Sequence, residues 1–147
     1  MKRLIAICLF GLFFAAVSAD NPQRKFSPEK FQAELEQYIT SEASLSPQEA
    51  AAFFPLYREM QKKQRFIFNQ KRKLGTVKPV DEQECMRAIQ KRDQLELELK
   101  SIQQTYHNKF FGVLPASKVF DVIKAEDRFY RKSFRNWGKA KREKTQK

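Results

Sequence analysis

Apolar residues recur along the chain with the spacing of one face of an α-helix. Residues 27–41 place them at i, i+4, i+7 and i+8, which is the helical period. Residues 47–74, 81–110 and 115–137 show related patterns. The four sets of apolar positions are Phe31, Leu35, Tyr38 and Ile39; Phe53, Tyr57, Met60 and Ile67; Cys85, Ile89, Leu95, Leu99, Ile102, Tyr106 and Phe110; and Phe120, Ile123, Tyr130, Phe134 and Trp137. The pattern predicts an all-α fold of four helices.

Polar caps and prolines mark where these helices begin. Ser27 precedes the first helix, and Pro115 opens the fourth. The segments 46–49 (Ser-Pro-Gln-Glu) and 81–84 (Asp-Glu-Gln-Glu) have the form of capping boxes before the second and third helices. Pro55 falls in the third turn of the second helix, where it removes a backbone hydrogen bond. We therefore expect a kink there.

Glycines mark the expected helix ends. Gly75, Gly112 and Gly138 each follow a helical segment. The second and third helices then extend about 27 residues, or roughly 40 Å, whereas a compact globule of this size has a radius of gyration of about 14 Å. They should form a long antiparallel hairpin across the link 75–80. Because such a thin layer leaves an apolar side uncovered, we expect a cradle-like homodimer.

The first 19 residues have a different character from the rest. Lys2 and Arg3 precede an apolar run over residues 4–17. The run ends in Val17-Ser18-Ala19, whose small residues are typical of a cleavage site. This is the form of a cleavable signal peptide, and the run is short for a membrane span. The sequence thus predicts a signal peptide at 1–19, a single helical domain at 20–137 and a basic flexible tail at 138–147.

Cysteine usage agrees with this division. Cys8 lies in the predicted signal peptide, which leaves Cys85 as the one cysteine of residues 20–147. An intramolecular disulfide is then impossible after cleavage. We interpret Cys85 as a small buried hydrophobic residue, with a thiol made more acidic by its place in a helix's first turn or an intermolecular disulfide as alternatives.

Charge is the strongest compositional signal. The formal net charge is +12, which favours an acidic partner. Residues 58–79 hold eight basic residues and one acidic residue, and residues 114–147 hold eleven and four. Aromatic residues interleave with both basic blocks. The residues that we predict to contact a client are Arg58, Lys62, Lys63, Arg65, Phe66, Phe68, Lys71, Arg72, Arg128, Arg131, Lys132, Arg135 and Trp137.

The sequence gives no pattern typical of an enzyme or a metal site. Residues 20–147 contain one histidine, His107, and no glycine-rich phosphate loop or nucleophile elbow. Glu126 and Asp127 occupy adjacent helical positions that face different directions, so we interpret them as solvated charges. We therefore expect no catalytic residues, no cofactor and no metal. Nucleic acid, the usual partner of a basic and aromatic surface, is disfavoured by export.

One short segment resembles a known family. Leu45-Ser46-Pro47-Gln48-Glu49, followed by Phe54-Pro55-Leu56-Tyr57, resembles the LTxxQ motif of the Spy/CpxP-like periplasmic stress proteins. The motif and capping residues of this resemblance are Leu45, Ser46, Pro47, Glu49 and Pro55. In that family a second copy opens the last helix, and here its place is taken by the degenerate segment 113–117. The resemblance implies an all-helical, cradle-shaped homodimer with a basic concave face in the periplasm.

The resemblance also implies a function. Family members act as ATP-independent holdase chaperones or as adaptors that dampen an envelope-stress sensor. We therefore predict a periplasmic chaperone-like protein that binds unfolding or acidic proteins. The alternatives are a regulatory adaptor that docks on a sensor domain, and a binder of anionic envelope surfaces such as lipopolysaccharide or phospholipid head groups through residues 58–79 and 128–147. A metal-responsive role is disfavoured by the lone His107.

Overall fold

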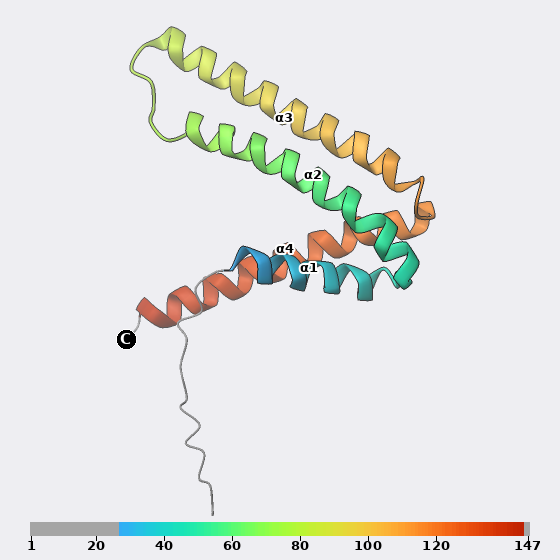
Figure 1. The fold of residues 1–147 in the computed structure, drawn as a ribbon. Helices are drawn as coiled ribbons and strands as arrows, with labels where there is room; N and C mark the ends of the chain where they lie inside the picture. Colours follow the sequence, from blue (N-terminus) through green and yellow to red (C-terminus); the bar gives the residue numbers. More distant parts are fainter. Residues whose placement is uncertain (1–26, 146–147) are drawn as a thin grey trace, which may run out of the picture.

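The computed structural model describes residues 27–145, with side chains for residues 27–139. It contains four helices, α1 (Pro28–Glu42), α2 (Pro47–Leu74), α3 (Glu82–Phe110) and α4 (Ala116–Thr145), and no β-strand occurs between residues 27 and 145 (Figure 1). The predicted all-α class is therefore confirmed. The predicted signal peptide at 1–19 lies outside the described residues.

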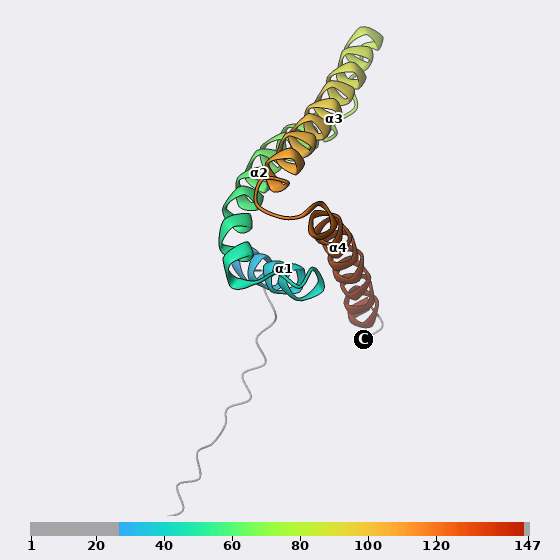
Figure 2. The same cartoon turned by 90° about the vertical axis from the view of Figure 1, so that its right-hand side faces the viewer.

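The helices form two pairs that meet at an angle. α2 packs against α3 as an antiparallel hairpin, and α1 packs against α4. Viewed from the side, the hairpin rises away from the α1/α4 pair, and α2 bends in its N-terminal part (Figure 2). Pro55 lies inside α2, as the sequence predicts. The long hairpin is confirmed, and its outer part projects away from the α1/α4 pair (Figure 1).

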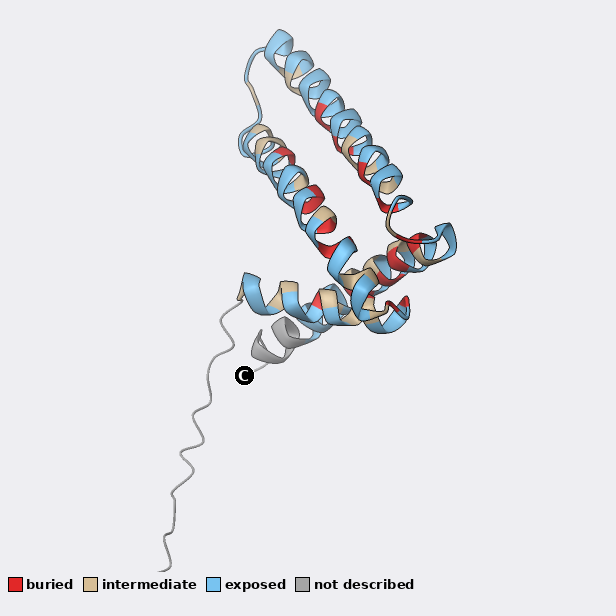
Figure 3. Cartoon of the chain, turned by 45° about the vertical axis from the view of Figure 1, so that its right-hand side comes forward, coloured by how far each residue is buried: buried red, intermediate tan, exposed pale blue. Residues whose placement is uncertain are grey.

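Most of the core lies where the two pairs join. The Phe53 ring lies 4.8 Å from the Phe110 ring and 5.4 Å from the Tyr57 ring, measured between centroids. Each buried aromatic side chain of this size contributes about 1.5–3 kcal/mol through its removal from water. A smaller cluster of Ile67, Leu95 and Leu99 holds the hairpin together further out. Buried positions accordingly follow the facing sides of the helices and thin out toward the hairpin tip (Figure 3).

The predicted starts of α1 and α3 are confirmed by their capping hydrogen bonds, although only the Asp81 half of the capping box predicted at 81–84 forms. Ser27 accepts from the Lys30 N–H at 3.2 Å, and Asp81 accepts from the Glu84 N–H at 3.0 Å. Both side chains satisfy donors that have no partner within the first turn of a helix. Gly75 follows the last residue of α2, as expected.

The face of α4 that is buried differs from the face predicted from the sequence. The buried residues of α4 are Val119, Val122, Ala125 and Phe129. Phe120 is 59% exposed, and Phe134 and Trp137 are also mostly exposed, while Ile123 and Tyr130 are partly buried. The prediction followed the bulkiest apolar residues. The face of α4 that packs against its neighbours instead consists mostly of small side chains. On α3, Ile89 is likewise exposed rather than buried.

The fourth helix also continues further than expected. The prediction that it ends at Gly138 is wrong, because α4 extends through this glycine to Thr145. Gly138 does not adopt a positive φ, and the side of the helix where its side chain would lie is open. A glycine inside a helix lowers stability by only about 1 kcal/mol relative to alanine. The basic residues that follow favour a helix C-terminus through its dipole.

Candidate functional site in the angle between the helix pairs

The motif residues at 45–49 form the corner from which α2 departs. The Ser46 N–H donates to Glu49 Oε2 at 2.8 Å, and the Glu49 N–H donates to Ser46 Oγ at 3.2 Å. This is the reciprocal capping box that the sequence predicts. Pro47 occupies the first turn, and Leu45 is buried in the core.

The same corner holds the start of α4. Lys118 Nζ donates to Glu49 Oε2 at 2.6 Å and to the Ser44 carbonyl at 3.0 Å. The hydrogen bond from Lys118 lowers the pKa of the Glu49 carboxyl, and the hydrogen bond from the Ser46 backbone adds to this. The motif is therefore a structural joint between α2 and α4, and it orients the two helix pairs.

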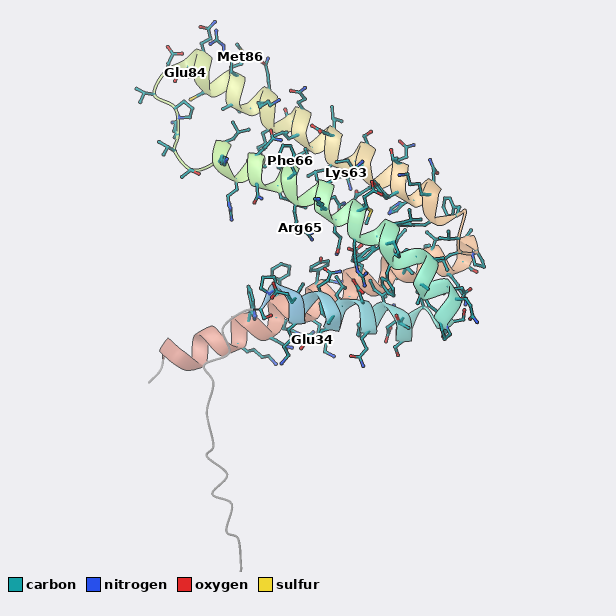
Figure 4. All side chains as sticks on the ribbon, in the orientation of Figure 1. Glu34, Lys63, Arg65, Phe66, Glu84 and Met86 are labelled. Carbon is teal, nitrogen blue, oxygen red and sulfur yellow. The ribbon has the colours of Figure 1, made fainter. Side chains whose placement is uncertain are left out.

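A groove lies in the angle that this joint sets. Its volume is about 690 Å³, and residues from all four helices line it. Its walls are Pro28, Phe31 and Gln32 of α1, Gln61, Gln64, Arg65 and Phe68 of α2, Gln103 of α3, and Glu126, Asp127, Tyr130 and Phe134 of α4. Arg65 lies on the side of α2 that faces the α1/α4 pair (Figure 4). The groove thus combines aromatic walls with a polar set of side chains.

A half-buried carboxylate, that of Glu126, lies in this groove. The Tyr57 hydroxyl donates to Glu126 Oε1 at 2.6 Å. Burial raises the pKa of Glu126, the Tyr57 hydrogen bond partly opposes this, and the charge of Asp127 raises it further. Burial also raises the pKa values of Tyr57 and Tyr130. The interpretation of Glu126 as a solvated charge is therefore wrong, whereas Asp127 is exposed.

The predicted client-contacting residues of α2 do not share one face. Arg65 and Phe68 line the groove. Lys62, Lys63 and Phe66 line a separate hollow of about 440 Å³ toward α3. Lys71 and Arg72 line a third hollow near the hairpin tip, beside Cys85. Arg58 donates to both carboxylate oxygens of Glu36, at 2.7 Å from Nε and 2.5 Å from Nη2.

The predicted residues of α4 are divided in the same way. Arg128 pairs with Glu42 at 2.7 Å, and Lys132 lies 6.0 Å above the Tyr38 ring. Both therefore help to hold α4 against α1. Arg131, Arg135 and Trp137 are exposed. The structure brings part of the predicted set to the groove and its surroundings and assigns another part to contacts within the fold.

The thiol and the histidine have ordinary surroundings. Cys85 is half-buried rather than buried as expected, and its Sγ donates to the Pro79 carbonyl at 3.3 Å. Partial burial, with a smaller effect of Lys100, lowers the pKa of His107. Across the part of the chain that the structure describes, no three His, Cys, Asp or Glu side chains gather as a metal site would need, and none of the helices is long and apolar enough to cross a membrane.

Comparison with protein-family models, with curated proteins and with solved structures finds no match to this chain.

Proposed function

We propose that the chain is an exported, ATP-independent holdase that binds unfolding or acidic proteins in the periplasm. One observation carries this proposal: large aromatic side chains stand exposed beside basic ones. Phe66 is 66% exposed, Phe134 is 67% exposed and Trp137 is 58% exposed. Exposed apolar groups of this size, surrounded by polar residues, are typical of protein-binding surfaces.

The mechanism follows from the two kinds of side chain. The basic residues attract acidic segments over distances of about a Debye length, which raises the rate of encounter. The aromatic rings then contact apolar segments that an unfolding protein exposes. Each contact is weak, so a client can leave and refold, yet bound segments are kept from pairing with one another. Such competition with aggregation needs no nucleotide.

Two features of the sequence support the compartment and the class. Residues 1–19 have the form of a signal peptide, and the corner 45–49 resembles the LTxxQ motif of Spy/CpxP-like proteins. In the structure this corner is a joint that sets the angle between the helix pairs. A motif with that role fits a family in which shape, rather than catalysis, carries the function.

We further propose that two chains associate. Beyond its base the α2/α3 hairpin is two helices thick, and Ile89 and Leu97 are among the exposed apolar side chains that it carries (Figure 1). Two helices bury only one stripe on each other, so a second copy would cover part of what remains. A homodimer would also place four basic helical blocks on one assembly, which increases its capacity for acidic clients.

Paired variants of equal charge test the proposed function. Arg131→Gln with Arg135→Gln removes two exposed cations of α4, and Arg87→Gln with Lys91→Gln removes two from α3, outside both basic blocks. The measurement is light scattering of a chemically denatured client diluted into buffer with each variant. We expect the α4 pair to suppress aggregation less than the wild type, because its cations lie beside Phe134 and Trp137, and the α3 pair to suppress it equally well.

Either of two results would contradict the proposal: no suppression by the wild-type chain, or equal loss in the two variants, which would mean that net charge alone matters. Solution scattering on the same samples gives the number of chains per particle. Capture of one tight stoichiometric partner, in place of many weak clients, would instead favour the adaptor alternative.

A further inference from the structure

A glutamate in the groove between the helix pairs, Glu126, has no ion-pair partner among residues 27–139. It accepts one hydrogen bond, from the Tyr57 hydroxyl at 2.6 Å. Elsewhere in the chain basic residues are abundant, and Glu36, Glu42, Glu49 and Glu96 each pair with one within 3 Å. Glu126 is half-buried, and the single hydrogen bond from Tyr57 replaces only part of the hydration that its carboxylate loses.

Gln61 is a second polar residue that lines the groove. Gln61 is 6% exposed, and its Oε1 has no hydrogen-bond partner in the structure. A buried acceptor left without a donor lowers stability by about 1–3 kcal/mol. Gln61 and Glu126 belong to different helices, α2 and α4, and line one groove. Because the Gln61 Oε1 atom is enclosed, a ligand in the groove would reach the carboxylate of Glu126 and not this oxygen.

The walls of the groove suit a cation as well. Tyr130, Phe134 and Phe68 line it with aromatic rings, whose faces attract ammonium and guanidinium groups. Its volume of about 690 Å³ falls within the range of roughly 300–1,000 Å³ typical of small-molecule sites. Arg65 is the basic residue that lines the groove, and it is exposed and makes no ion pair with Glu126. The groove is thus an acidic, aromatic site within a strongly basic chain.

We propose that this groove binds a primary ammonium or guanidinium group, with Glu126 as its counter-charge and the aromatic rings as its walls. The group could belong to a free amine or to a lysine or arginine side chain of a peptide, because both present the same donors. This proposal does not rest on the holdase function: the exposed basic residues would still attract acidic segments if the groove bound nothing.

Calorimetric titration of the full chain tests the proposal. One arm uses agmatine, which carries both an ammonium and a guanidinium group, and the other uses a short lysine- and arginine-containing peptide, with its lysine-acetylated, citrulline-containing form as the uncharged control. Glu126→Gln keeps the side-chain shape and removes the charge. Asp121→Asn removes one exposed carboxylate of α4 that does not line the groove, and it is the matched control.

We expect Glu126→Gln to weaken binding roughly ten- to a hundredfold and Asp121→Asn to change it less than about twofold. Binding of agmatine alone would identify a site for free amines, and binding of the basic peptide alone would identify a site for a peptide side chain. No detectable binding of either probe to the wild type, equal weakening in the two variants, or equal binding of the uncharged peptide would overturn the proposal.

The pH dependence gives a readout that a purely structural role would not change. As the pH rises through the raised pKa of Glu126, the carboxyl ionises and affinity for the cation should increase, while in Glu126→Gln it should stay flat. The charged and titratable groups around Glu126 are Tyr57 and Arg65 of α2, Asp127 and Tyr130 of α4, and the Glu36–Arg58 pair between α1 and α2. A pH profile that is the same in both proteins would contradict the assignment of Glu126.

Discussion

At the scale of single residues, two glutamates show how surroundings decide what a carboxylate does. Glu49 lies at a helix corner and accepts from Lys118 and the Ser46 backbone, so its pKa is lowered and its charge is stabilised. Glu126 lies inside the groove, where burial raises its pKa. The first carboxylate stabilises the fold as an anion. The second lowers the stability of the fold whenever it is ionised and unpaired.

The raised pKa of Glu126 leads to a prediction about stability. In the unfolded chain this carboxyl ionises near pH 4.5, and in the folded chain it ionises at a higher pH. Its contribution is therefore most favourable at low pH and is lost as the pH rises through the folded value. We expect Glu126→Gln to be more stable than the wild type at neutral pH, with the difference shrinking toward about pH 4.5.

Urea unfolding of the two proteins between about pH 4.5 and about pH 8 measures this difference in unfolding free energy. The comparison isolates Glu126, because Glu36 and Glu49 titrate alike in both. Asp121→Asn, which alters an exposed carboxylate on the same helix, should show no such trend. A Glu126→Gln chain that is less stable than the wild type at neutral pH would mean that the ionised carboxylate already has a partner in the folded chain.

At the scale of elements, helix boundaries could be predicted because they depend on local chemistry. Ser27, Ser46 and Asp81 cap the helices that they were expected to cap, since each bond joins residues close in sequence. The buried face of α4 could not be predicted, because Phe120 and Phe134 repeat with a helical period as regular as that of Val122 and Phe129. Which face turns inward depends on the close packing of α4 on its neighbours, and no local pattern encodes that.

This difference can be measured with two identical substitutions on α4. Phe129 is buried against Phe31 and Tyr38, at centroid distances of 5.2 Å and 5.5 Å, whereas the exposed Phe120 contacts Lys124 at 5.3 Å. Phe129→Ala should lower the unfolding free energy by about 3–5 kcal/mol through the cavity that it leaves. Phe120→Ala should change it by less than about 0.5 kcal/mol. Denaturant unfolding gives both values. Equal losses of unfolding free energy would mean that Phe120 is as buried as Phe129, which would contradict the buried face seen in the structure.

At the scale of the whole molecule, the candidate site depends on four helices that meet at an angle. Gln61 and Glu126 line one groove although 64 residues separate them in the sequence. Composition and periodicity identified the two basic blocks, but the residues of these blocks have different places in the fold. Arg65 and Phe68 line the groove, while Arg58 and Arg128 pair with glutamates of α1. No sequence pattern distinguishes Glu126 from the solvated glutamates, so the groove could be found only in the structure.

In the proposed function, exposed cations collect clients that exposed aromatic rings then hold. Suppression of the aggregation of a denatured acidic client by the wild-type chain, measured as the salt concentration rises from about 0.1 M to about 1 M, tests this most directly, because the Debye length falls from about 10 Å to about 3 Å. We predict that the rate of client association falls steeply over this range and that suppression weakens with it. Suppression with an association rate that salt leaves unchanged would contradict the claim.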